Sequence, residues 1–147
     1  MARSLLSRIL FALLFCSTPA FADVNMFQRL SGIYGDPHPD GADCTQAVQR
    51  LTFSDQSTRG DLQVVSDPQG PNMHVSLDLP FTVLHPTQRG IEIRFDDEEI
   101  LTPNGTLVVW EFRPLTAPNR YCWHRTDWPT DRCINMVQFC EAEVPMS

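Results

Sequence analysis

Short segments in which apolar and polar residues alternate, separated by proline or glycine, most constrain how this chain can fold. Residues 73–83 are apolar at every second position, and residues 91–95 repeat the pattern after a turn at 85–90. A period of two is typical of a half-buried strand, so the two segments predict a β-hairpin. Pro80 interrupts the first strand and is expected at a bulge or an edge position, because proline donates no ladder hydrogen bond.

Further short segments, rich in β-forming residues and bounded by turn residues, predict more strands. They cover residues 30–35, 46–54, 62–66, 106–112, 120–126 and 134–141. Helical periodicity is confined to residues 24–30, about two turns. A chain of seven to nine short strands with hairpin connections predicts an all-β fold, an antiparallel β-barrel or a β-sandwich. We favour a barrel, because closure removes the exposed edges that promote aggregation.

Residues 1–22 resemble a cleavable signal peptide. Arg3 and Arg8 give a basic start, residues 9–16 are an unbroken apolar run, and small residues precede the expected cleavage site after Ala22. The run of about eight residues is far shorter than the roughly 20 that span a bilayer. We therefore expect no transmembrane segment and a periplasmic or secreted protein.

The expected mature chain, residues 23–147, suits a single β-barrel domain. A lipoprotein anchored at Cys16 is the alternative, and the bulky Phe15 before that cysteine disfavours it. Cleavage removes two of the 11 arginines and leaves nine against 18 acidic residues, a net charge of −9. This charge repels nucleic acid and attracts basic partners, although acidity also serves solubility alone.

Four cysteines remain in the expected mature chain, and an even number in an exported domain predicts two disulfides. Three pairings are possible. We prefer Cys122–Cys133, joining neighbouring strands, with Cys44–Cys140 tying the early chain to the last strand. Spacings of the C-x₂₋₄-C type are missing from the sequence, which disfavours a zinc site.

The segment Leu30-Ser31-Gly32-Ile33-Tyr34-Gly35, preceded by a short helix, resembles the start of a lipocalin-type barrel. That family usually has Gly-x-Trp here, and this chain has Tyr34 in the tryptophan position. Ser31-Gly32 also resembles a motif of small periplasmic lysozyme inhibitors, which are β-barrels with disulfides. Both resemblances imply a barrel fold more than a particular function.

Residues 121–128 carry the densest group of side chains suited to binding. Aromatic and guanidinium groups are common at binding hot spots, so this segment predicts a surface that grips a partner or lines a pocket. The alternative is that its indoles pack in the core and cover an end of the barrel. The candidate binding residues are Tyr121, Trp123, Arg125 and Trp128, together with Trp110.

Other motifs predict neither a metal site nor a catalytic one. Residues 36–43 partly resemble a calcium loop, but Ala47 stands where the bidentate glutamate should be. The acidic run 96–99 alternates faces if extended, and its best interpretation is a solvated turn. The four histidines, among them His124, have no nominated nucleophile. We therefore expect no cofactor and no enzymatic activity.

These patterns predict an exported, non-catalytic binding protein. In the first interpretation the barrel holds a small apolar ligand, with Leu77, Leu79, Ile93 and Trp110 facing inward. In the alternative, the acidic surface docks a basic protein, for example as an inhibitor of a lysozyme-like enzyme. The interior volume of the barrel distinguishes them, because a packed interior favours a role for the surface.

Overall fold

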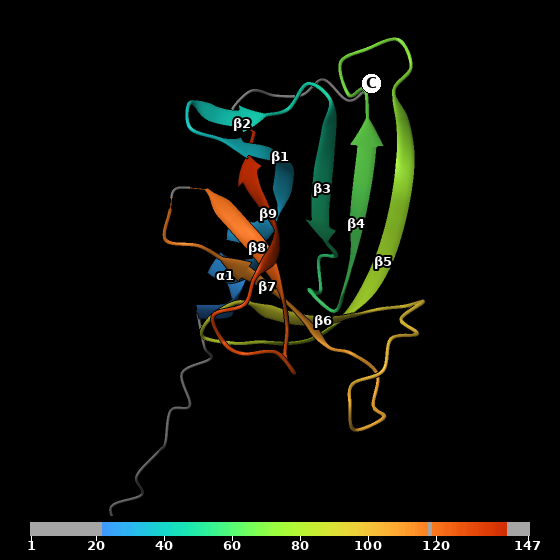
Figure 1. The fold of residues 1–147 in the computed structure, drawn as a ribbon, viewed down its shortest axis with the longest axis vertical. Helices are drawn as coiled ribbons and strands as arrows, with labels where there is room; N and C mark the ends of the chain where they lie inside the picture. The colour runs from blue at the N-terminus through green and yellow to red at the C-terminus, as the bar shows by residue number, and fades with distance from the viewer. Residues whose placement is uncertain (1–21, 118, 141–147) are drawn as a thin grey trace, which may run out of the picture.

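The computed structural model describes residues 22–117 and 119–140 (Figure 1). Within that part of the chain there are one helix and nine strands. They are α1 (Ala22–Leu30), β1 (Gly32–His38), β2 (Gly41–Asp43), β3 (Ala47–Phe53), β4 (Arg59–Ser66), β5 (His74–Pro86), β6 (Ile91–Phe95), β7 (Trp110–Pro114), β8 (Arg120–Arg125) and β9 (Ile134–Phe139). The predicted signal peptide lies outside the described residues, apart from Ala22.

Eight strands close into the antiparallel β-barrel that the sequence predicts, rather than a sandwich. Neighbours pair in the order β1-β3-β4-β5-β6-β7-β8-β9, and β1 also pairs with β9. The closing register places Tyr34 opposite Phe139 and Gly35 opposite Gln138. The ninth strand, β2, forms a hairpin with the outer part of β1. Residues 36–43, expected as a turn, therefore form this small hairpin.

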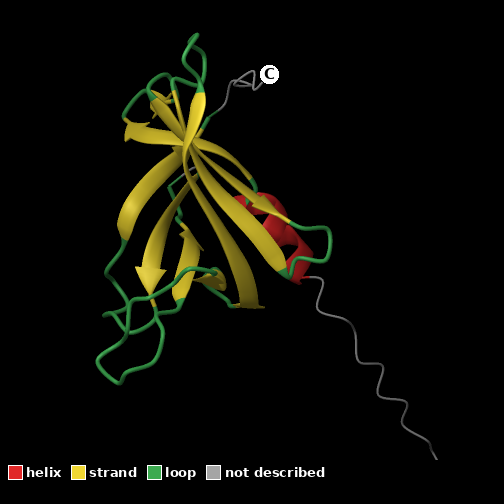
Figure 2. Cartoon of the chain, turned by 90° about the vertical axis from the view of Figure 1, so that its right-hand side faces the viewer, coloured by secondary structure: helices red, strands yellow, loops and turns green. Residues whose placement is uncertain are grey.

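Helix α1 covers one end of the barrel (Figure 2). Its Phe27 ring meets Phe53 edge to face, with ring centroids 5.1 Å apart. At its last turn the Tyr34 hydroxyl donates a hydrogen bond to the Leu30 carbonyl, at 3.0 Å. This bond satisfies a carbonyl that the end of a helix leaves free, and it fixes the helix to the first strand.

Aromatic side chains fill the barrel. Phe81 and Phe112 are fully buried, with ring centroids 5.4 Å apart, and Phe112 lies 5.8 Å from Tyr121. Most ring pairs meet edge to face, the arrangement that aromatic quadrupoles favour. Gly60 makes room for one ring, because a Cβ at that position would lie 2.3 Å from the Phe81 ring. The described core therefore consists largely of interlocking rings.

Both preferred disulfides are confirmed. Cys122–Cys133 links β8 to the start of β9, with Cα atoms 5.8 Å apart. Cys44–Cys140 links the end of the β2 hairpin to the end of β9, with Cα atoms 6.2 Å apart. This second bridge lies in a small apolar cluster, separate from the main core, that includes Val48 and Val65.

The first half of β5 differs from its predicted half-buried state. Val75 and Leu77 are 51% and 44% exposed, although the predicted apolar face placed both in the core. The reason is the length of β5, since β6 pairs only with residues 81–86 and the earlier residues pair with β4 alone. Pro80 lies where this pairing begins, and its carbonyl accepts a hydrogen bond from Asp96 N. On its other side Pro80 pairs with Asp61 of β4, so it lies where β5 changes from one paired neighbour to two.

The predicted strand 106–112 is wrong in its first half. Strand β7 begins at Trp110, and the preceding residues belong to a long loop between β6 and β7, braced by an isolated bridge between Leu101 and Leu107. The turn at Asn104-Gly105 folds this loop back on itself rather than starting a barrel strand. Gly105 has φ +77°, as such a turn requires.

The two disulfides should contribute unequally to stability. Cys44–Cys140 spans 96 residues and Cys122–Cys133 spans 11, so loop entropy predicts about 4.7 and about 3 kcal/mol, respectively. Urea unfolding of C44S/C140S and C122S/C133S variants measures both values. A larger loss of unfolding free energy in C122S/C133S than in C44S/C140S would contradict the explanation by loop entropy.

Candidate functional site

The predicted binding segment divides between the core and one end of the barrel. Tyr121 is fully buried, and its hydroxyl donates a hydrogen bond to Gln49 Oε1 at 3.0 Å. Trp123 is partly buried and packs against Phe95 and Phe112. These side chains face inward, so they support the barrel end from inside rather than forming an outer surface.

At the same end Trp128 packs against Trp110, which belongs to the core. Their ring centroids are 5.9 Å apart and their rings nearly perpendicular. The guanidinium carbon of Arg132 lies 4.0 Å from the Trp128 ring centroid, and that of Arg125 lies 5.2 Å away. Arg125 is also paired with Asp127. Both guanidinium groups therefore make cation–π contacts with Trp128, and this group packs over the end of the core.

A shallow apolar pocket of about 200 Å³ lies beside Trp110. Its walls come from β5, the end of β6, the following loop and β7, and its acidic members are Asp97 and Glu98. Glu98 Oε2 accepts a hydrogen bond from Trp110 Nε1 at 2.7 Å. The contact fixes one carboxylate at the pocket, and the apolar walls comprise Leu79, Pro80, Phe95, Ile100 and Trp110.

The loop 96–109 presents aliphatic side chains to solvent next to the acidic run. Ile100 is 49% exposed and Leu101 is 56% exposed, and Leu107 beside them is also exposed. Hydrogen bonds across the loop join Thr102 to Thr106. At its start Asp96 pairs with Arg59 of β4. These contacts hold the apolar groups in place while leaving them uncovered by the described residues.

The loop surface was missed by the sequence prediction, which treated residues 96–99 as a turn and residues 106–112 as a strand. Three signals bear on it. Four acidic residues lead directly into Ile100-Leu101, and Asn104-Gly105 then turns the chain back. Together these signals indicate a compact loop with an apolar tip. Ile100 and Leu101 lie outside any alternating strand pattern, so the pattern does not direct their side chains into the core.

His124 is buried, and its Nδ1 lies 2.7 Å from the Arg132 carbonyl oxygen. A carbonyl only accepts, so Nδ1 carries the proton and donates. The described residues contain no cluster of three or more His, Cys, Asp or Glu side chains placed to bind a metal. Among residues 22–117 and 119–140, no helix is long and apolar enough to cross a membrane.

The residues predicted to face a ligand inside the barrel differ in their burial. Ile93 is fully buried and Trp110 is 8% exposed, and both belong to the packed core. Leu79 packs against that core from its rim, whereas Leu77 lies beyond it and is exposed. The described interior is occupied by the chain's own side chains.

Comparisons of the chain with protein-family models, with curated proteins and with solved structures found no match. The arguments about its function therefore rest on its own sequence and geometry.

Both tyrosines of the chain are buried and face each other, with ring centroids 4.6 Å apart. Burial raises the pKa of Tyr34 to about 12. Burial also raises the pKa of Tyr121 far above its usual range, although the neighbouring Trp123 indole partly opposes this shift. Each folded-state pKa therefore exceeds the value of about 10 expected for an unfolded chain.

The free energy of unfolding should be independent of tyrosine ionisation below pH of about 10 and fall above it. The unfolded chain then loses phenolic protons that the folded chain keeps, at a cost of up to about 1.4 kcal/mol per pH unit for each tyrosine. Urea unfolding as a function of pH, with tyrosinate absorbance of the native protein, measures this. Normal phenolic titration of the folded protein near pH of about 10 would contradict the assigned burial.

Proposed function

We propose that this protein is an exported, non-catalytic binding protein that docks a basic protein through the surface of its loop 96–109. The observation that carries the proposal is the exposed aliphatic group Ile100, Leu101 and Leu107 on a braced loop that begins with four consecutive acidic residues. An apolar centre with a charged rim is the common anatomy of a protein interface.

Charge favours a basic partner. The mature chain is expected to carry a net charge of −9, and the acidic run 96–99 concentrates negative charge beside the apolar tip. Such a field accelerates encounter with a positively charged protein and makes binding depend on salt. Glu98 contributes from a fixed position, because the Trp110 indole holds its side chain.

The size of the pocket favours a protein side chain over a whole small molecule. A volume of about 200 Å³ is below the roughly 300–1,000 Å³ typical of ligand pockets. It suits one aliphatic or basic side chain of a partner. The apolar walls also support the other candidate, a small apolar ligand, but such a ligand would have to displace packed rings to enter the barrel.

Export is supported by the signal-like residues 1–22 and by the two disulfides, which are compatible with an oxidising compartment. The resemblance to lipocalins and to lysozyme inhibitors rests on Leu30–Gly35. In the structure Tyr34 of that segment lies in the barrel and anchors α1. This role is consistent with a shared barrel architecture and says nothing about a partner.

The proposal is tested with purified basic proteins, including a lysozyme-like enzyme, by calorimetry at low and moderate salt. We expect at least one member of the panel to bind in a salt-sensitive manner. The variants L101S and D97N should each weaken that binding by about tenfold or more, since they remove an interface anchor and a rim charge.

The matched control is V75S, which alters an equally exposed aliphatic residue on β5. This variant should bind like the unmodified protein. If L101S and V75S behaved alike, or if binding were insensitive to salt, the loop would not be the docking surface. Saturable binding of a fatty acid, with no basic protein bound, would favour the ligand interpretation instead.

A further inference from the structure

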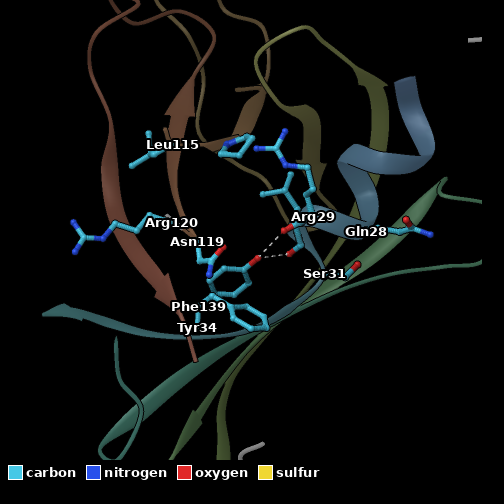
Figure 3. A pocket seen from close by; sticks show the side chains of 10 residues that line it. Gln28, Arg29, Ser31, Tyr34, Leu115, Asn119, Arg120 and Phe139 are labelled. Atoms are coloured by element: carbon cyan, nitrogen blue, oxygen red, sulfur yellow. Dashed lines mark hydrogen bonds between the residues drawn. The ribbon is translucent and has the colours of Figure 1, made fainter. Parts of the chain in front are cut away.

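The α1 end of the barrel contains a cavity that the proposed docking function does not use. Its volume is about 280 Å³, close to the lower limit of typical small-molecule sites. It lies between the last turn of α1, the start of β1, the β7–β8 turn and the end of β9 (Figure 3). The loop 96–109 lies on the other side of the barrel (Figure 1).

The walls of this cavity combine rings and aliphatic groups with polar groups that can hydrogen bond. Tyr34 and Phe139 form an edge-to-face pair at its base, and Leu115 forms a further apolar part. Arg29 of α1 and Asn119 of the β7–β8 turn lie on either side of the Tyr34 hydroxyl (Figure 3). Asn119 holds a left-handed conformation, φ +56°, which places its amide at the turn.

The Tyr34 hydroxyl weakens the repulsion that the C-terminal end of helix α1 would exert on an anion in this cavity. The end of a helix carries partial negative charge on its free carbonyls. Tyr34 donates towards the carbonyls of Leu30 and Arg29, at 3.0 and 3.3 Å. Because burial raises the pKa of this phenol to about 12, it remains a neutral donor at ordinary pH.

The charge around this end is opposite to that of the whole protein. A second cavity, of about 310 Å³, adjoins the first and shares Arg29, and Arg89 also lines it. Among the described residues lining either cavity there is no Asp or Glu. Neither Arg29 nor Arg89 has an ion-pair partner within the described chain. Arg113, which also lines the second cavity, is paired with the buried Glu111.

We infer that the cavity beside Arg29 binds a small organic carboxylate with an apolar body. Arg29 supplies a charge-assisted hydrogen bond to the carboxylate, and Asn119 supplies an amide donor. Tyr34, Phe139 and Leu115 cover the apolar part. The guanidinium charge distinguishes an anion from a neutral analogue, and the apolar walls distinguish such a molecule from inorganic phosphate.

The test uses benzoate as the probe, with benzamide and inorganic phosphate as comparisons, and follows backbone resonances of the full mature chain by NMR. Benzoate should shift resonances of Ser31, Leu115 and Asn119 saturably, and both comparison probes should bind at least about tenfold more weakly. The variant R29Q should weaken benzoate binding by about tenfold or more.

The matched control is R132Q, which makes the same change in charge beside Trp128 at the other end. It should leave benzoate binding unchanged. Equal weakening by both variants would mean a general charge effect and overturn the site, as would shifts centred elsewhere or equal binding of benzamide. Retained resonances of Tyr34 and Phe139 in R29Q show that the variant is folded. Binding of a basic protein at the loop 96–109 is a separate measurement.

Discussion

Edge-to-face packing of aromatic rings inside the closed barrel is the interaction on which the rest of this structure depends. Phe81, Phe112 and Tyr121 are completely buried and contact one another in sequence. Tyr34 extends the chain of rings to the strand pair that closes the barrel. Because rings of this size occupy the centre, large openings are left to the ends, and binding is expected there rather than inside.

The two ends differ in charge and in the kind of support they receive. At one end Trp110 meets Trp123 and Trp128 edge to face, and Glu98 ties the acidic loop to Trp110 through a hydrogen bond. At the other end α1 is fixed by Tyr34, next to Arg29, which has no ion-pair partner among the described residues. At each end one hydrogen-bonded aromatic residue joins an outer element to the core rings. Trp110 holds the acidic loop at one end, and Tyr34 holds α1 at the other.

The sequence predicted the barrel and the disulfides because their signals are local or discrete. The alternation along residues 91–95 and the even number of cysteines can both be recognised in the sequence without knowing which strands pair. The error at Val75 and Leu77 arose because apolar alternation does not reveal how far a neighbouring strand extends. β6 has 5 residues and β5 has 13, so the first part of β5 has no partner on that side, and the residues that end β6 lie in a different segment of the chain.

The candidate sites were less predictable than the fold, because they depend on contacts between segments that are distant in the sequence. The segment 121–128 was recognised by composition, but composition does not distinguish a core ring from a surface ring, and Tyr121 is a core ring. The cavity at the α1 end joins Arg29, Tyr34, Asn119 and Phe139. Arg29 and Tyr34 come from the start of the described chain and Asn119 and Phe139 from its last part, and the β1–β9 pairing that closes the barrel brings the two groups together.

The most direct test of the account is a crystal structure of the protein as purified from cells, with no ligand added. The account predicts that density among Phe81, Phe112 and Tyr121 is fully explained by their side chains. Ligand-sized density within this group, with the rings displaced, would contradict the claim that the core is filled and that binding occurs at the ends of the barrel.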